Sequence, residues 1–396
     1  MKILTVIPWF PSYSPAQWME GCFQYRQAKK LVDNGHEVVV LTIQKPGRPS
    51  SENVDGILVY RFPAYTMPKI RYFIPFFPKL NRLIVDICKR HKIDLIEFFS
   101  SDFLTSVPAI YIKKKTGLPV VVVVNGFPGM SWFSGSTIVD TFGYIYTNLI
   151  GKRIIKSADG IRLLHSSLRG DLLKLGINGK KAKVRVIHQG VDVNIFHPRS
   201  DKSLTRESLG VSEQDFFVLY AGRLVNPVKM KGTDYLIEAV KDLLPQYHNL
   251  KLILAGDGDG RKKNEAMASS IKDNVIFTGQ RNDIFMLMSA ADVVVLTSLS
   301  EGCPIVVLEA SACGIPVIAS RVGGVPDIVE DGKTGIVISP RNITELKQAL
   351  IKMMNNPLLR VEMGKRARER IEQGFTWDKT CSRLEEFYLE LIKQTN

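Results

Sequence analysis

The segment from residue 300 to residue 313 reads SEGCPIVVLEASAC, and it follows an apolar, mostly β-branched run at residues 293–297. This run predicts a buried strand of a parallel sheet, because such strands are apolar on both faces. Pro304 suits the first turn of a helix beginning just after the strand. Glu301 and Glu309 stand on either side of that position with seven residues between them. Two carboxylates beside a buried strand indicate a polar ligand. The residues that follow the other strands indicate which kind of ligand it is.

The composition is that of a folded protein with two domains. A chain of 396 residues exceeds one ordinary core, and 45% hydrophobic with 23% charged residues is usual for globular proteins. The apolar stretches are shorter than the roughly 20 residues that span a bilayer, and the N-terminus lacks a signal pattern. The five cysteines show no C-x-x-C spacing. We expect a reduced, cytoplasmic protein without disulfides or structural zinc.

Positive charge is concentrated in the first half. Residues 1–190 hold 27 Lys and Arg against 12 Asp and Glu, whereas residues 191–396 hold 26 against 27. The first half therefore carries the entire excess of positive charge. Such a balance indicates an anionic partner of that half, which is nucleic acid, a membrane surface or a phosphorylated substrate.

Strands alternate with helices along both halves. This pattern predicts two doubly wound α/β domains, with a boundary between residues 190 and 191 inside the stretch VIHQGVDVNIFHPRS. The strand candidates of the first half are residues 2–7, 37–42, 95–98 and 120–124, and those of the second half are residues 216–221, 250–255, 275–277, 292–297 and 316–319.

The loops after the second-half strands carry the residues with chemistry, since ligands of open α/β sheets bind outside the carboxyl ends of the strands. The loop GRLVNPVKMKG at residues 222–232 supplies Arg223, Lys229 and Lys231. The loop GDGDG at residues 256–260 reads as a flexible turn. The helix after Glu301 would add N–H groups that favour a phosphate. Carboxylates bind hydroxyl groups, so cations beside carboxylates predict a diphosphate between two polyols, which is a nucleotide sugar.

Each of these features also has a simpler explanation. Glu301 could only stabilise a helix N-terminus by about 0.3–1 kcal/mol, and Glu309 could be a solvated helix residue. Arg223 and Lys231 could be surface charges. Their joint occurrence at successive strand ends favours a site. A dinucleotide site is disfavoured, because no strand is followed by G-x-G-x-x-G.

The segment SEGCPIVVLEASACGIPVIASRVGGVPDIVEDGKTGIVI at residues 300–338 resembles the donor site of retaining GT-B glycosyltransferases of family 4, with their E-x7-E motif. The segments NGHEVVVLT, VIHQGVD, GRLVNPVKMKGTDYLIEAV, LILAGDGDG, VIFTGQRND and FTWDKTCSRLEEFYLEL also resemble that family, in the same order. The resemblance implies two Rossmann-like domains facing a central cleft. Residues 1–190 would bind the acceptor, residues 191–374 the donor, and a terminal helix at residues 375–396 would cross back onto the first domain.

The resemblance also implies roles for individual residues. Arg223 and Lys231 would neutralise the donor diphosphate and stabilise charge on the leaving group, which is the largest electrostatic need of the reaction. Lys231 precedes a glycine as in the family, while Lys229 is a rival because the loop is slightly long. Glu301 would hold hydroxyls of the transferred sugar, without acting as a nucleophile. Glu309 would hold the ribose hydroxyls.

Other donor contacts are implied in the same way. The backbone at Gly302, Cys303 and Pro304 would lie along the sugar and phosphate, and Arg281 would lie near the base. The resemblance implies no metal and no cofactor besides the UDP- or GDP-linked co-substrate.

The chain departs from the family on the acceptor side. Asn125 stands where a histidine is frequent, and it can form a hydrogen bond to a donor-sugar hydroxyl but cannot take up a proton. Gly21 alone represents the paired glycines of the first loop, and Gln189 replaces an asparagine.

Residues 61–92 contain eight Lys and Arg with one acid, interleaved with aromatic residues. We expect this patch to bind an anionic membrane, on the inner face of the cell membrane, or a lipid-linked or anionic glycan acceptor. The alternative is a core-facing helix with a solvated basic side, and nucleic acid is disfavoured because no nucleic-acid module accompanies the patch. The cations chosen to represent it are Lys69, Arg71, Lys79 and Arg82.

Three functions stay open at this point. The first is a glycosyltransferase of cell-envelope polysaccharide or glycolipid synthesis. The second is a nucleotide-sugar epimerase with the same fold. The third is a sugar-nucleotide-binding protein without catalysis, for which Asn125 is the hint.

Overall fold

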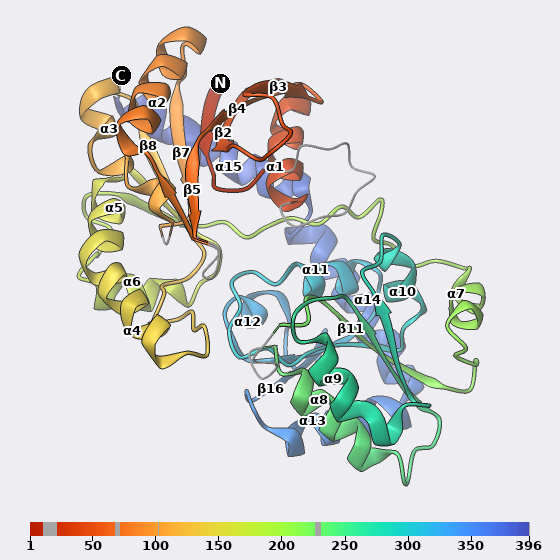
Figure 1. The fold of residues 1–396 in the computed structure, drawn as a ribbon. Helices are drawn as coiled ribbons and strands as arrows, with labels where there is room; N and C mark the ends of the chain where they lie inside the picture. Colours follow the sequence, from red (N-terminus) through yellow and green to blue (C-terminus); the bar gives the residue numbers. More distant parts are fainter. Residues whose placement is uncertain (11–21, 68–71, 102, 226–230, 396) are drawn as a thin grey trace. The chain divides into compact units, whose positions relative to one another are not determined.

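The computed structural model describes residues 1–10, 22–67, 72–101, 103–225 and 231–395. The described chain forms two compact units (Figure 1). The first comprises Met1–Trp132, Ser136–Gln189 and Trp377–Asn396, and the second comprises Phe133–Gly135 and Gly190–Thr376. The expected boundary after residue 190 lies one residue from this division. Within the described ranges, no helix combines the length and the apolar character needed to cross a bilayer.

The first unit is built on a sheet in which every described pairing is parallel except that of β3 with β4. The strand order is β10-β9-β8-β7-β1-β2-β4-β3, so the chain reverses its direction of winding between β1 and β7. The strands are β1 (Lys2–Val6), β2 (Glu37–Ile43), β3 (Ser51–Val54), β4 (Ile57–Phe62), β7 (Leu95–Phe99), β8 (Val120–Val124), β9 (Gly160–Leu163) and β10 (Lys183–Val186). A separate hairpin joins β5 (Ala64–Met67) to β6 (Tyr72–Pro75).

Helices cover this sheet because its strands are apolar on both faces; β8, for example, is five consecutive buried valines. The α-helices are α1 (Cys22–Asp33), α2 (Phe77–His91), α3 (Ala109–Thr116), α4 (Thr137–Tyr146), α5 (Lys152–Ser157), α6 (Leu168–Lys174) and α15 (Trp377–Thr395). A 3₁₀ turn, η1 (Leu104–Ser106), follows β7, and a π-helical turn, η2 (Thr147–Gly151), joins α4 to α5.

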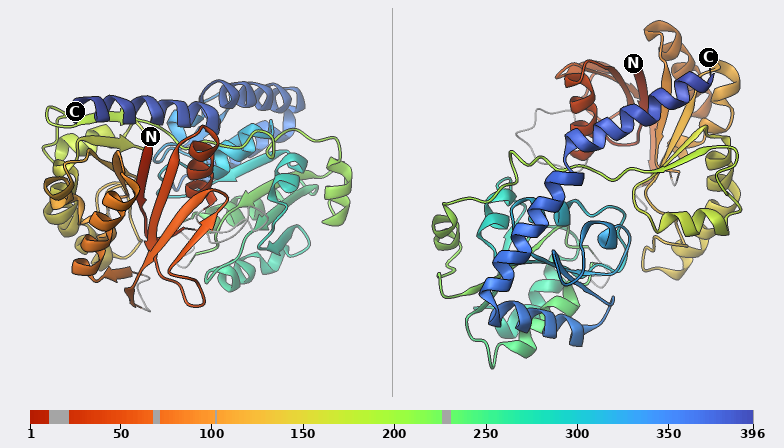
Figure 2. Two further views of the ribbon diagram at one scale, coloured as in Figure 1. Left: turned by 90° about the horizontal axis from the view of Figure 1, so that it is seen from above. Right: turned by 180° about the vertical axis from the view of Figure 1, so that it is seen from behind.

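Helix α15 completes the first unit although it follows the second unit in the sequence (Figure 2). It packs against α1 and over β9, where a Cβ atom on Gly160 would lie 2.5 Å from Leu391 Cδ1. The Tyr388 hydroxyl donates a hydrogen bond to Glu97 Oε1 at 2.5 Å. Both side chains are fully buried, and burial together with Glu97 raises the Tyr388 pKa.

The Glu97 carboxylate belongs to a buried polar network. Arg162 Nη1 lies 3.8 Å from Glu97 Oε1 and donates to Gln27 Oε1 at 2.7 Å. Arg162 Nε also donates to the Ile187 carbonyl oxygen at 3.1 Å. The network therefore connects α1, β7, β9 and α15 with one another and with the backbone at Ile187, which follows β10.

The second unit is built on a parallel sheet with the order β13-β12-β11-β14-β15-β16. Its strands are β11 (Phe216–Ala221), β12 (Leu250–Ala255), β13 (Val275–Gly279), β14 (Val293–Leu296), β15 (Val317–Ser320) and β16 (Gly335–Ile338). The helices are α7 (Lys202–Ser208), α8 (Thr233–Leu243), α9 (Arg261–Ala268), α10 (Ile284–Ala290), α11 (Ile305–Ala312), α12 (Val325–Ile328), α13 (Ile343–Asn355) and α14 (Pro357–Gly374), with a 3₁₀ turn η4 (Ser269–Ile271).

The winding of this sheet also reverses, between β11 and β14, which pair directly through Val218 and Val293. A crevice at the carboxyl ends of the strands is the usual ligand site of such sheets. The prediction of two doubly wound α/β domains is confirmed. The strands β3, β4, β5, β6, β9, β10 and β16 are additions to the predicted set.

Candidate active site

The loops that leave β11 and β14 meet at the switch point of the second sheet. Lys231 Nζ, after β11, lies 2.5 Å from Glu301 Oε1, after β14. The Lys231 side chain is 30% exposed and the Glu301 side chain 16% exposed. The structure therefore brings together two of the three residues predicted to be catalytic, at a place that a ligand can reach.

Backbone contacts hold Lys231 in this position. Gly232 has φ +66°, and a Cβ atom there would lie 2.0 Å from the Thr297 carbonyl oxygen, so glycine is required. The Thr297 hydroxyl donates to the Gly232 carbonyl oxygen at 2.7 Å. Helix α8 then begins at Thr233. The end of β14 thus positions both members of the pair.

Arg223 lies half-buried on a backbone segment that the glycine-rich loop 256–260 holds on both sides. Leu224 N donates to the Asp257 carbonyl oxygen at 3.0 Å, and Gly260 N donates to the Leu224 carbonyl oxygen at 2.9 Å. A Cβ atom on Gly258, whose φ is +150°, would lie 2.2 Å from the Leu224 carbonyl oxygen. Residues 258–260 form the turn that the sequence predicts, and the glycines of GDGDG permit close packing of two backbones.

Tyr220, at the end of β11, is a functional-site residue that sequence analysis missed. Its side chain is 1% exposed, and its hydroxyl donates to the Arg223 carbonyl oxygen at 3.3 Å. Burial and the nearby Glu301 carboxylate raise its pKa, so the hydroxyl keeps its proton. The available signal was a lone hydroxyl-bearing residue in the otherwise apolar strand FFVLYA.

The loop after β15 supports Glu301 from the other side and was also missed. Gly323 has φ +51°, and a Cβ atom there would lie 1.9 Å from the Glu301 carbonyl oxygen. Gly324 N donates to the Gly302 carbonyl oxygen at 2.7 Å. The sequence VGG at residues 322–324 was the signal for this close approach.

Helix α11 starts directly after Pro304, at the place where the sequence predicts the start of a helix. Pro304 takes the N-cap position with extended geometry, φ −72° and ψ 108°, and the first helical residue is Ile305. Glu309 lies one turn into the helix on its half-buried side. Cys303 and Pro304 are buried, and their predicted backbone contacts to a donor stay a prediction. Burial raises the pKa of the neighbouring Cys313 thiol to about 12, so it is not a nucleophile at neutral pH.

Arg281 lies in the loop after β13, at the same edge of the sheet. Its Nε and Nη2 donate to the two Asp283 carboxylate oxygens at 2.7 and 2.5 Å. The hydrogen bond from Arg281 is the main cause that lowers the Asp283 pKa. The Arg281 guanidinium is therefore paired with Asp283, and its predicted contact with a base stays a prediction.

Most of the remaining predicted residues belong to the first half of the sequence, among them Asn125, a predicted donor contact. Asn125 follows β8 and is half-buried. Lys79 and Arg82 are exposed on α2, whose opposite side buries Leu80 and Ile84 in the core. Helix α2 therefore has the core-facing, basic-outside form that was the alternative to a membrane segment. Four residues lie outside the described ranges, namely Gly21, Lys69, Arg71 and the rival Lys229.

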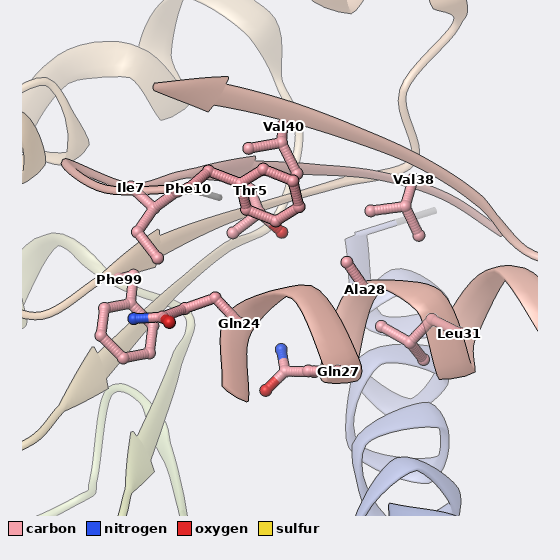
Figure 3. A pocket seen from close by; sticks show the side chains of 10 residues that line it. All are labelled: Thr5, Ile7, Phe10, Gln24, Gln27, Ala28, Leu31, Val38, Val40 and Phe99. Carbon is pink, nitrogen blue, oxygen red and sulfur yellow. The ribbon is translucent and has the colours of Figure 1, made fainter. Parts of the chain in front are cut away.

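A small cavity lies between α1 and strands β1 and β2 of the first unit (Figure 3). Thr5, Phe10, Gln24 and Phe99 are among the side chains lining it. Its volume is about 10 Å³, the space of about one water molecule, whereas ligand pockets start at about 300 Å³. This cavity is a packing gap and not an acceptor site.

Comparison with known proteins gives two family models that together span most of the chain. The model "Glycosyl transferases group 1" matches residues 201–370, and the model "Glycosyltransferase Family 4" matches residues 23–195. An uncharacterized glycosyltransferase of Methanocaldococcus jannaschii is 29% identical over 364 residues, 89% of each chain. The UDP-Gal:alpha-D-GlcNAc-diphosphoundecaprenol alpha-1,3-galactosyltransferase of Escherichia coli is 28% identical over 341 residues, 83% of this chain and 84% of that one.

Solved structures share the fold across its whole length. Sucrose-phosphate synthase from Thermosynechococcus elongatus has a TM-score of 0.82 over 99% of each chain, at 22% identity. Two doubly wound units, with a cation and a carboxylate at the switch point of the second, define the class of GT-B glycosyltransferases. The chain belongs to the group 1 glycosyltransferases, and it is a transferase of that family.

Proposed function

We propose that this enzyme transfers a sugar from a nucleotide-diphosphate donor to an acceptor hydroxyl with retention of configuration at the anomeric carbon. The contact between Lys231 and Glu301 carries the proposal. Because the two side chains touch, a ligand that engages both must carry its phosphate and its hydroxyl groups side by side. A sugar bonded directly to a diphosphate has this arrangement.

The charges suit the departure of a nucleoside diphosphate. As the glycosyl–phosphate bond breaks, negative charge grows on the leaving phosphate, and Lys231 and Arg223 are the cations proposed to stabilise it. One preorganised group of this kind contributes about 2.7–4 kcal/mol. Glu301 orients the transferred sugar through its hydroxyls, and the departing phosphate oxygen takes the proton of the acceptor. The scheme uses no metal, since the two cations balance the diphosphate.

The acceptor is proposed to be a lipid-linked or otherwise anionic glycan, bound by the first unit during synthesis of a cell-envelope glycolipid or polysaccharide. The excess positive charge of residues 1–190 supports an anionic acceptor. The E. coli relative, whose name specifies a sugar on diphosphoundecaprenol, supports a lipid-linked one. Asn125 would then form a hydrogen bond to the donor sugar without taking up a proton.

The test is incubation of the protein with a panel of UDP- and GDP-linked sugars, with and without EDTA, followed by NMR of the products. Slow donor hydrolysis that releases the retained anomer and persists in EDTA is the expected result. An epimerised donor would show that the protein is an epimerase, and donor binding without turnover would show that it lacks catalysis. Loss of hydrolysis in EDTA would contradict the metal-free scheme.

A further inference from the structure

Helix α4 of the first unit presents an apolar face to solvent. The whole helix is described, and none of its side chains is buried. Ile138 is 71% exposed and Phe142 69% exposed, and the face continues through Ile145, 46% exposed, to Leu149 in η2, 55% exposed. Spacings of four, three and four residues place these four side chains on one side of a helix. They are called the α4 stripe below.

The opposite side of α4 is attached to the unit, which fixes the direction of the stripe. A Cβ atom on Gly143 would lie 2.8 Å from Pro128 Cβ, so the helix approaches residues 127–132 closely. The Thr147 hydroxyl donates to the Pro128 carbonyl oxygen at 3.0 Å, and the Tyr146 hydroxyl donates to the Ser101 carbonyl oxygen at 3.3 Å. The helix lies at one end of the first unit (Figure 1). The stripe is thus a surface of the folded unit and not a frayed segment.

Positive charge follows the stripe in α5, the helix that η2 joins to α4. Its cations are Lys152, Arg153 and Lys156, and none of them forms an ion pair with another described residue. Arg153 and Lys156 are exposed. The only acid between residues 137 and 157 is Asp140. An apolar helix face bordered by unpaired cations has the chemistry of a segment that lies in the surface of an anionic bilayer.

We propose that the α4 stripe, together with the three cations that follow it, is the surface through which the first unit contacts an anionic lipid bilayer. The proposal rests on the lipid-linked acceptor of the proposed function, because an enzyme acting on such an acceptor works at the bilayer surface. It places the contact on α4 and not on α2, whose apolar side is in the core. A contiguous apolar surface of this kind indicates a binding partner, whereas scattered exposed apolar residues do not.

The positive charge beside the stripe favours an anionic bilayer over a second copy of the chain as the binding partner. A second copy of the chain would bring the same three cations and the same excess positive charge of residues 1–190, which repel. An anionic bilayer offers both an apolar layer for the stripe and negative headgroups for Lys152, Arg153 and Lys156.

The experiment is co-sedimentation of the protein with phosphatidylcholine vesicles and with vesicles that also contain phosphatidylglycerol, at low and high salt. The stripe variant Ile138→Asn with Phe142→Asn should bind anionic vesicles about tenfold more weakly. The matched control is Leu204→Asn with Leu358→Asn, two leucines of the second unit that are 66% and 86% exposed. Its vesicle binding should equal that of the wild type.

A charge variant separates the two parts of the surface. Changing Lys152, Arg153 and Lys156 to Gln should abolish the preference for phosphatidylglycerol and the salt dependence, because screening acts on exposed charges. Changing Lys69, Arg71, Lys79 and Arg82 to Gln should have the smaller effect. The proposal is wrong if this second charge variant loses binding while the stripe variant keeps it, or if the wild type ignores anionic vesicles at low salt. A stripe variant that loses only concentration-dependent self-association would assign the surface to a second copy.

Hydrolysis of a soluble nucleotide sugar keeps this test separate from the proposed function. The stripe residues have no role in the donor site, so the stripe variant should hydrolyse the donor at the wild-type rate. If the wild type does not hydrolyse the donor, the proposed function is contradicted. The vesicle experiment then still decides whether the α4 stripe contacts an anionic bilayer.

Discussion

Glu301 and Glu309 lie on one loop-and-helix segment, yet they are proposed to contact different parts of the donor. Glu301 touches Lys231 at the switch point, where bond breaking would occur. Glu309 lies one turn into α11. Substitution of each residue should therefore change a different kinetic property of the enzyme.

We predict that Glu309→Ala weakens donor binding while Glu301→Ala mainly lowers kcat. Ribose contacts are shared by the ground and transition states, whereas contacts to the transferred sugar strengthen as charge develops. Steady-state kinetics of donor hydrolysis and calorimetric titration with the nucleoside diphosphate measure the two effects. Near-wild-type kinetics for both variants would contradict the assignment of the site.

Lys231→Ala and Arg223→Ala should each lower kcat/KM by about 100-fold or more, as for loss of one preorganised charge-stabilising group. Because Lys231 also pairs with Glu301, its removal leaves a carboxylate without its cation, so Lys231→Met with Glu301→Gln is a useful double variant. Lys229→Ala is the matched control in the same loop. Turnover lost in Lys229→Ala but kept in Lys231→Ala would transfer the role to Lys229.

The residues that could be predicted from sequence are those whose chemistry is local. Glu301 and Lys231 follow apolar runs and belong to recognisable motifs. Tyr220 and Gly323 act through contacts with residues 223 and 301. The strand FFVLYA and the run VGG mark them as unusual positions, but neither stretch shows which residue is contacted. The sequence also could not show that Lys231 and Glu301 pair, because that contact depends on the order of strands in the sheet.

At the scale of elements, the glycine-rich loop 256–260 and the loop that carries Arg223 act as one unit. Their backbone hydrogen bonds leave no room for a side chain at Gly256, Gly258 or Gly260. The position of Arg223 is thus determined by a segment more than thirty residues later in the chain.

Gly258→Ala should lower kcat/KM for donor hydrolysis and the melting temperature of the second unit, because its Cβ would meet the Leu224 carbonyl oxygen at 2.2 Å. The strained φ of +150° adds a cost of about 1–3 kcal/mol. Gly170→Ala, in helix α6 with nothing within 4 Å of the added atom, is the matched control and should leave both unchanged. Wild-type activity and stability in Gly258→Ala would show that the loop backbone can move to accommodate the added Cβ atom, and would contradict this prediction.

Tyr388→Phe should loosen α15 from the first unit. The buried Glu97 carboxylate loses a donor, and hydrogen bonds to charged groups contribute about 1.5–3 kcal/mol. Hydrogen exchange of α1 and α15 should accelerate, while that of the second unit stays unchanged. Tyr65→Phe, at a 69% exposed tyrosine of the first unit, is the control. Equal protection of α15 in Tyr388→Phe and wild type would contradict the role of the network.

Apolar runs predicted the elements that lie inside the sheets, since burial on both faces selects β-branched residues. Strand β9 was missed because its short sequence GIRL contains Arg162, a charge that local pattern assigns to the surface although it is 1% exposed. Only the long-range partners Glu97 and Gln27 make that burial possible. Strand β10, with KVRV, was missed for a different reason, because basic residues alternate with its valines and none of its residues is buried.

At the scale of the whole molecule, both units hide thiols that should resist modification. Burial raises the pKa of Cys88, Cys313 and Cys381 to about 12 in each case. We predict that peptide mapping after iodoacetamide treatment at pH 8 finds these three unmodified in the folded protein and modified in urea. Rapid alkylation of any of them without denaturant would contradict its burial.

The same shifts predict how stability depends on pH. An unfolded thiol ionises near pH 8.5, whereas the folded one does so near pH 12, so ionisation favours the unfolded chain above pH 8.5. This contribution to the free energy of unfolding is fully present below pH 8.5 and is lost as the pH rises. Urea titrations at pH 7.5 and pH 9.5 should show a drop that the Cys313→Ala variant reduces.

The chain's two sheets were predictable as a whole because strand–helix alternation is a pattern of the entire sequence. The assignment of residues 377–396 to the first unit depends on contacts with α1 and β9, and in the sequence it was only implied by family resemblance.

That assignment has a consequence for biosynthesis. The ribosome makes α15 after the whole second unit, so the core of the first unit lacks Phe387, Tyr388 and Leu391 until residues 190–376 have been translated. At about 5–20 residues per second, synthesis from Gly190 to Thr376 takes about 10–40 seconds, during which the second unit is completed and the first is not. A premature stop near residue 376 would therefore damage the half of the protein that was translated first.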